Sequence, residues 1–92
     1  MEKIRKIFKA LSMKGALNVY MTIYAGCQSG SYATFESLVR ITAINENTLR
    51  RITNNLSRHR LIKSVRYGTT RGKFYIVSDK DFAKKLYDFI GM

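Results

Sequence analysis

The sequence predicts an α+β domain that is mostly α-helical and carries one β-hairpin towards its C-terminus. Apolar residues recur at helical spacing in five segments of the 92-residue chain. Two β-prone runs, 61–67 and 73–78, flank a loop whose glycines, Gly68 and Gly72, permit the backbone angles of a hairpin. Proline is absent, and no repeat or low-complexity segment divides the chain. We therefore expect residues 1–92 to form a single domain.

The first expected helix, residues 1–12, is amphipathic. Its apolar positions, spaced as on one helix face, are Ile4, Ile7, Phe8 and Leu11. Lysine and arginine occupy the opposite side, an arrangement that also suits a helix lying on an anionic membrane. Because nothing else in the sequence suggests lipid, we favour packing against the core or against a second subunit.

The second segment, residues 14–26, is almost continuously apolar and predicts a central helix that is buried on most sides. Gly26 and the polar residues after it are expected to end this helix. The same stretch has the order of a signal peptide that precedes a lipoprotein-type cysteine. We disfavour that alternative because Asn18 and Thr22 interrupt the apolar run, and because Tyr24 stands where such motifs have a small aliphatic residue.

Two short helices are expected in the middle of the chain, each opened by a capping side chain. Thr34 precedes the first, residues 35–41, and Asn45 opens the second, residues 45–59. Only a brief break at 42–44 separates them. One face of the second helix is apolar, with steps of three, one and three between its members, which are Leu49, Ile52, Thr53 and Leu56.

The last expected helix opens at Ser78-Asp79-Lys80-Asp81 and ends near Ile90, so residues 78–92 follow a core of residues 14–77. Two short helices separated by a turn of three or four residues and followed by a basic hairpin are typical of a winged helix-turn-helix domain. The expected architecture is therefore a three-helix core plus a β-hairpin wing, with additional N- and C-terminal helices.

The charge of the chain is strongly positive and unevenly distributed. Seventeen Lys and Arg against six Asp and Glu give a formal net charge of +11. Between Arg40 and Lys73, nine basic residues accompany one acid, Glu46. A field of this sign attracts polyanions, of which nucleic acid is the commonest inside a cell. The alternative is a basic protein whose charges are merely solvated.

An enzyme is not expected. The acids have no spacing that pairs two carboxylates, and His59 has no evident orienting partner. One Cys and one His cannot form a structural zinc site, and the lone Cys27 cannot close an internal disulfide. No stretch reaches the roughly 18–20 apolar residues of a membrane span. We therefore expect no metal, no cofactor and no membrane, and no small-molecule effector is evident.

The residues from about Thr34 to Leu86 carry a family resemblance. From Ser37 they read SLVRITAINENTLRRITNNLSRHRLIKSVRYGTTRGKFYIVSDKDFAKKL. This stretch resembles the small winged-helix transcription regulators of the MarR and ArsR type, common in archaea and bacteria and also carried by archaeal viruses and plasmids. Ala43 departs from the family pattern because a glycine is usual in the turn, and Arg60 departs because a glycine normally ends the recognition helix. We therefore expect a tighter or more helical turn, and a last helical turn that runs on.

The resemblance implies that the helix at 45–59 enters the major groove of double-stranded DNA and that the wing, residues 67–73, reaches the backbone or the minor groove. The side chains opposite the apolar face of that helix form a row spaced by four, three and four residues: Asn47, Arg51, Asn54 and Arg58. Asn pairs with the edge of adenine and Arg with that of guanine. We expect this row to read bases.

Other residues of the same helix are expected to flank the row. Arg50 and Asn55 are placed to reach either bases or phosphates, whereas Asn45 and Thr48, at the helix start, suit phosphate contacts. The alternative is a solvated polar face. Such faces usually mix Glu with Lys, but no acid lies between the first turn of this helix and Asp79.

The wing residues expected to contact DNA are Arg66, Thr69, Thr70, Arg71 and Lys73. Arg71, near the tip, is suited to a narrow minor groove or to phosphate. A hairpin tip that is merely soluble is the alternative. His59 is predicted to bind backbone carbonyls at the end of its helix.

These observations predict a homodimeric, sequence-specific regulator that binds double-stranded DNA in the cytoplasm, at the nucleoid or, if viral, in a host cell. Apolar surface at both chain ends is expected to form the dimer interface, through Ile4, Ile7, Phe8, Leu11, Phe82, Leu86, Phe89 and Ile90. Two copies would address a palindrome with half-sites about one helical turn apart. The alternative is a sequence-tolerant architectural protein, or a winged-helix adaptor of the transcription machinery.

Overall fold

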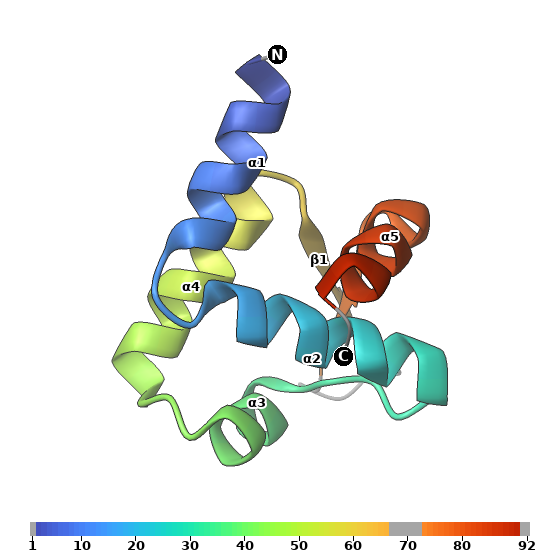
Figure 1. Cartoon of the computed structure of the whole chain (residues 1–92). Helices are drawn as coiled ribbons and strands as arrows, with labels where there is room; N and C mark the ends of the chain where they lie inside the picture. Colours follow the sequence, from blue (N-terminus) through green and yellow to red (C-terminus); the bar gives the residue numbers. More distant parts are fainter. Residues whose placement is uncertain (1, 67–72, 91–92) are drawn as a thin grey trace.

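A computed structural model describes residues 2–66 and 73–90, and for residues 2–4 and 6 the backbone only. This part of the chain forms five helices and one hairpin (Figure 1). The elements in chain order are α1 (Glu2–Ser12), α2 (Ala16–Ser29), α3 (Phe35–Thr42), α4 (Glu46–Arg58), β1 (Ile62–Arg66), β2 (Lys73–Val77) and α5 (Lys80–Ile90). The predicted order of elements is confirmed.

Helix α2 lies at the centre of the molecule, as predicted. It contacts α1, α3, α4, α5 and β2, and Figure 1 shows it crossing between the other helices. Val19, Tyr20 and Ile23 are completely buried on it. Burial raises the pKa of the Tyr20 phenol far above its usual range, and its hydroxyl has no hydrogen-bond partner among the described residues. The apolar character of α2 therefore supplies the middle of the core.

Gly26 does not end α2, contrary to the sequence prediction. The helix continues to Ser29, and Gly30 ends it with the left-handed φ of 80°. Gly26 instead lets the returning chain pass close to the helix. A Cβ at this position would lie 2.8 Å from the carbonyl oxygen of Ser31 and 3.1 Å from the amide nitrogen of Ala33. Its missing side chain therefore serves packing rather than helix termination.

Helix α3 begins with the predicted cap. The Ser37 amide donates to Thr34 Oγ1 at 3.1 Å, and the Thr34 amide donates to Ser37 Oγ at 2.8 Å, which completes a capping box. Leu38 is fully buried, and Phe35 and Val39 pack against the core. These contacts fix α3 against α2 and α4.

The two positions that lack the family glycine keep the glycine conformation. Ala43 has φ 58° and ends α3, with its amide donating to the Val39 carbonyl at 3.0 Å. Arg60 has φ 59° and follows the end of α4. The expected tightened turn and prolonged helix are therefore wrong. A left-handed residue with a side chain costs roughly 1–2 kcal/mol, a cost that the packing of both helices offsets.

The hairpin is antiparallel and is tied to the loop before α3. Ile62 pairs with Val77, and Arg66 pairs with Lys73. The Tyr75 amide donates to the Ala33 carbonyl at 2.8 Å, which adds a bridge on the other edge of β2. Beside it, the rings of Tyr32 and Phe74 stack at 4.6 Å. These contacts hold the base of the hairpin in place relative to α3.

In the view of Figure 1, the terminal helix α1 lies at the upper left and α5 at the right, and α2 runs below both. Leu11 on α1 is 9% exposed and belongs to the core of the single chain, so it offers little surface to the subunit interface for which it is predicted. Helices α2 and α4 contact α1 and account for this burial. On α5, Ala83 is buried while Phe89 is 88% exposed. Within the described residues, no helix has the length and apolar character needed to cross a membrane.

Candidate nucleic-acid interface

The inner face of α4 is the predicted one, and it fixes how the helix is turned. Leu49, Ile52 and Leu56 are 0% exposed, and Thr53 is 3% exposed. The Thr53 hydroxyl donates to the Arg50 carbonyl at 3.2 Å, so its polar group is satisfied inside the helix. Because all four residues of the predicted apolar face are buried, the opposite side of α4 is directed to solvent.

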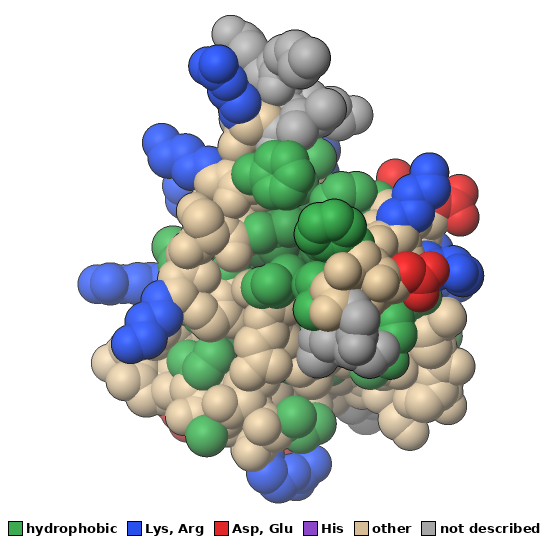
Figure 2. Space-filling model, in the orientation of Figure 1, with side chains coloured by type: hydrophobic (Ala, Val, Ile, Leu, Met, Phe, Trp, Pro, Cys, Tyr) green, Lys and Arg blue, Asp and Glu red, His purple; other side chains and the backbone are tan. Residues whose placement is uncertain are grey.

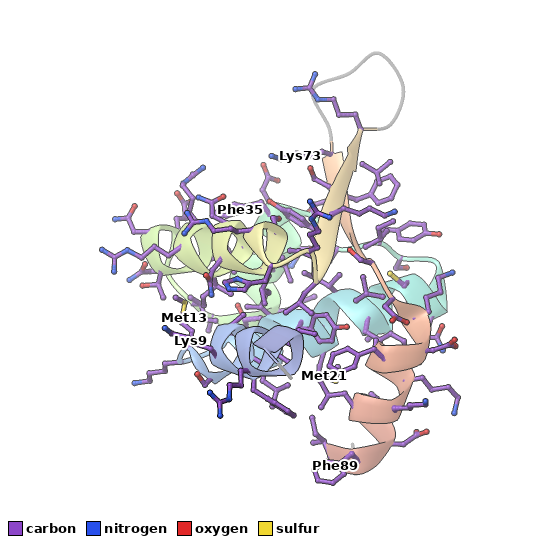
Figure 3. The ribbon with its side chains drawn as sticks, turned by 90° about the horizontal axis from the view of Figure 1, so that it is seen from above. Lys9, Met13, Met21, Phe35, Lys73 and Phe89 are labelled. Carbon is purple, nitrogen blue, oxygen red and sulfur yellow. The ribbon has the colours of Figure 1, made fainter. Side chains whose placement is uncertain are left out.

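The predicted base-reading row lies on that opposite side. Asn47, Arg51, Asn54 and Arg58 are all exposed. In Figure 3 the long side chains of α4 extend outward, away from the blue helix α1. Among the residues whose side chains the structure describes, the ion pair is Lys84–Asp88 on α5, so neither arginine of the row has a described carboxylate partner. The structure thus presents two amides and two guanidinium groups on one side of a helix.

The start of α4 is held by Asn45. The Thr48 amide donates to Asn45 Oδ1 at 2.9 Å, so the predicted cap is confirmed. That contact occupies the side-chain oxygen and leaves the amide nitrogen of Asn45 available. Thr48 is exposed at the same end. The first turn of α4 therefore offers polar donors next to the positive end of the helix dipole.

The other two flanking residues differ in surroundings. Arg50 is exposed, and its guanidinium carbon lies 5.0 Å from the centre of the Phe35 ring on α3. Asn55 is partly buried, and its carbonyl accepts the backbone amide of His59 at 3.1 Å. His59 Nδ1 lies 2.9 Å from the same carbonyl, which confirms the predicted capping role. The stack of Arg50 on Phe35 was not predicted, since no spacing rule links two residues on different helices.

The wing falls partly outside the described residues. Arg66 and Lys73, its two described members, are exposed partners at the open end of the hairpin. Thr69, Thr70 and Arg71 lie outside the described part of the chain. In Figure 3 the hairpin points away from the helices, with Lys73 labelled near its far end. Its two cations lie on the same molecule as the α4 row, without a carboxylate partner among the described residues.

An apolar surface lies beside the end of α4. Figure 2 shows hydrophobic side chains gathered between α1 and α5. An open hollow of about 1000 Å³ borders this region, and its lining includes Ile7, Met13, Arg58 and Phe82. Among the predicted interface residues, Phe8 is 59% exposed, Phe89 88% and Ile90 36%. Three other predicted interface residues are partly buried and pack against the core: Ile7, Phe82 and Leu86. The side chain of Ile4 lies outside the described residues.

Comparison with known proteins supports the fold. No family model matches the chain, and no curated protein matches it. The homodimeric winged helix-turn-helix DNA-binding domain of Mb0332 from Mycobacterium bovis, a possible ArsR-family transcriptional regulator, matches with a TM-score of 0.74 and 19% identity over 97% of this chain and 75% of that chain. HlyU from Vibrio cholerae matches with a TM-score of 0.80 and 15% identity over 99% and 95% of the two chains.

A third solved structure gives the same result. The transcriptional regulator HlyU from Vibrio vulnificus matches with a TM-score of 0.75 and 14% identity over 96% of this chain and 88% of that chain. Each of the three matches covers at least 96% of this chain. The chain therefore has the winged helix-turn-helix fold, with α2, α3 and α4 as its core, the hairpin as its wing and a further helix at each end.

Proposed function

We propose that this chain is a transcriptional regulator that binds specific sequences in double-stranded DNA. The observation that carries the proposal is the row of Asn47, Arg51, Asn54 and Arg58, exposed on one side of α4 and free of carboxylate partners among the described residues. The major groove admits an α-helix and displays a distinct donor and acceptor pattern for each base pair. Asn and Arg are the side chains that form bidentate contacts with adenine and guanine.

The remaining cations give the row its orientation in this proposal. Arg66 and Lys73 on the hairpin, with Arg71 between them in the sequence, contact the sugar-phosphate backbone or the minor groove beside α4. Contacts of this kind position a protein without reading sequence, and they make binding dependent on salt. The net charge of +11 adds long-range attraction to the polyanion.

The proposed regulator is a homodimer. The similar domain of Mb0332 is described as homodimeric. In this chain, Phe8 on α1 and Phe89 on α5 expose apolar rings, and Figure 2 shows hydrophobic side chains gathered between these two helices. A two-fold axis at this surface covers both rings and doubles the reading row, so each dimer recognises a palindromic site.

Competition binding tests the proposal. A labelled duplex, chosen by selection from a random library, is titrated with the protein at physiological salt and challenged with unlabelled selected or random duplex. We expect the selected duplex to compete about 10³-fold better or more. Equal competition by both duplexes, together with a steep dependence on salt, would show a sequence-tolerant coating protein instead.

A further inference from the structure

The Arg50 side chain is held by an aromatic ring from the neighbouring helix. Its guanidinium carbon lies 5.0 Å from the ring centre of Phe35, within the range of a cation–π contact. Phe35 is itself fixed, because it is the first residue of the capped helix α3 and packs against the core. Figure 3 labels Phe35 next to α4. Arg50 is therefore presented from a rigid platform although it is exposed.

This placement is not the default for a solvated arginine on α4. Glu46 lies four residues before Arg50, the spacing and order in which Glu and a basic residue form a favourable helical ion pair. An ion pair at the same spacing but in the reverse order exists on α5, between Lys84 and Asp88 at 3.0 Å, whereas the described residues show none between Glu46 and Arg50. Stacking keeps the charge and the N–H donors of Arg50 available, whereas an ion pair would occupy them.

The helix geometry directs Arg50 to the wall of a groove rather than to its floor. At roughly 100° per residue, Arg50 projects about 70° from the centre of the row formed by Asn47, Arg51, Asn54 and Arg58. It does so on the side of α3, as the contact with Phe35 shows. When the row faces base edges, a side chain displaced by this angle meets the phosphates that border the groove.

We infer that Phe35 is a positioning residue that holds Arg50 as a fixed phosphate contact on the α3 side of the recognition helix. The inference rests on the proposed function and deepens it, since it assigns Arg50 to the backbone and gives Phe35 a role in binding. A guanidinium that is already ordered loses less rotamer freedom when it binds phosphate. The aromatic ring thus strengthens DNA binding without touching DNA.

A double-mutant cycle on the full chain tests this inference. The variants are Arg50→Ala, Phe35→Leu and the double variant, with affinities measured on selected and random duplex over a range of salt concentrations. We expect Arg50→Ala to weaken both duplexes alike, by about tenfold, and to lower the salt slope by about 1. Phe35→Leu should weaken binding several-fold with an unchanged slope. The double variant should bind like Arg50→Ala, because Phe35 acts only through Arg50.

Two further variants separate positioning from folding. Phe35→Tyr keeps the aromatic face and should bind like the wild type. Arg50→Lys keeps the charge but not the planar stack, so it should show the slope of the wild type, a several-fold loss and no sensitivity to Phe35→Leu. Arg50 is exposed, so the affinity and salt slope of Arg50→Lys can be compared with those of the wild type even where Phe35→Leu unfolds the protein. Lys85→Ala on α5 is the matched control for loss of one exposed cation and should change neither affinity nor slope by a comparable amount.

The outcomes distinguish this inference from the proposed function. Wild-type protein that shows no preference for any duplex would overturn both. If the wild-type protein prefers its selected duplex, two results would overturn the inference alone. One is that the losses of affinity in the double-mutant cycle are additive, and the other is that Arg50→Ala changes the preference at one base pair only.

Discussion

Helices α4 and α5 are both amphipathic, but different faces of them lack partners within the chain. On α4 it is the polar face, and on α5 it is part of the apolar face. The inner face of α4 is fully covered by the chain itself, with three side chains at 0% exposure, while its outer face carries arginines without carboxylate partners among the described residues. On α5, Lys84 hydrogen bonds to Asp88, which raises the pKa of Lys84, whereas the apolar ring of Phe89 is exposed. Under the proposed function, the uncovered side of each helix meets a partner, which is a polyanion for α4 and an apolar surface for α5.

The largest expected effect concerns the apolar end of α5. Phe89→Ser should raise the dissociation constant of the dimer roughly a hundredfold or more, because burial of a Phe side chain contributes about 1.5–3 kcal/mol and a two-fold interface contains it twice. Sedimentation at micromolar concentration measures the change. Ile41→Ser, which removes another exposed apolar side chain from α3, is the control and should leave the dimer intact.

A wild-type chain that sediments as a monomer at that concentration would contradict the comparison directly. In that case the exposed ring of Phe89 would not mark a subunit interface.

The second prediction compares how much the inner faces of α4 and α5 contribute to the stability of the fold. Leu49→Ala should lower the free energy of unfolding by about 2–5 kcal/mol, because it opens a cavity at a fully buried site. Leu86→Ala should lower the free energy of unfolding by less, since Leu86 is only partly buried in the single chain. Both are measured by urea unfolding in the Phe89→Ser background, so that dissociation does not contribute. Equal losses would show that the chain alone covers α5 as well as it covers α4.

The faces of α4 were predictable from the sequence because helical periodicity determines them. Leu49, Ile52, Thr53 and Leu56 recur at helical spacing, and all four are buried. A wheel then places the opposite row without any knowledge of the fold. The exposure of that row agrees with the wheel, while its role in reading bases stays a prediction.

The errors arose where tertiary packing overrides a local signal. Gly26 is followed by polar residues, which is typical of a helix end. In the structure, however, Gly26 lets the chain at Ser31 pass close to α2. Ala43 and Arg60 lack the residue type that marks a left-handed turn, yet they adopt it. The apolar stripe of α1 reveals a buried face but not that its neighbours already cover Leu11. The burial of Leu11 in particular depends on contacts with helices that follow later in the chain.

The stack of Arg50 on Phe35 illustrates the same limit at the site. Within α4 alone, Glu46 is the evident partner for Arg50, because helical spacing brings them together. The ring of Phe35 becomes available only when the turn between α3 and α4 has its observed geometry. One-dimensional spacing therefore predicted the row on α4 but not the residue that supports its edge.

The smallest predicted effect compares the caps of the two helices. Asn45 Oδ1 accepts from the Thr48 amide at 2.9 Å, and Asp79 Oδ1 accepts from the Phe82 amide at 3.0 Å. Asn45→Ala and Asp79→Ala should each lower the free energy of unfolding by about 1 kcal/mol. Only Asn45→Ala should also weaken DNA binding, because in the proposed complex α4 meets the duplex and α5 does not. Loss of binding in both variants to the same extent would show that α5 contributes to DNA contact.

The most direct test of the account is a parallel selection of bound duplexes from a random library by the wild type and by Arg51→Ala. We predict that the wild type enriches a palindrome with half-sites about one helical turn apart. The Arg51→Ala selection should return the same palindrome with relaxed preference at one symmetric pair of positions, at a cost of about 1–3 kcal/mol in binding. Identical preferences in both selections, or no enriched sequence in either, would contradict the claim that the outer row of α4 reads bases.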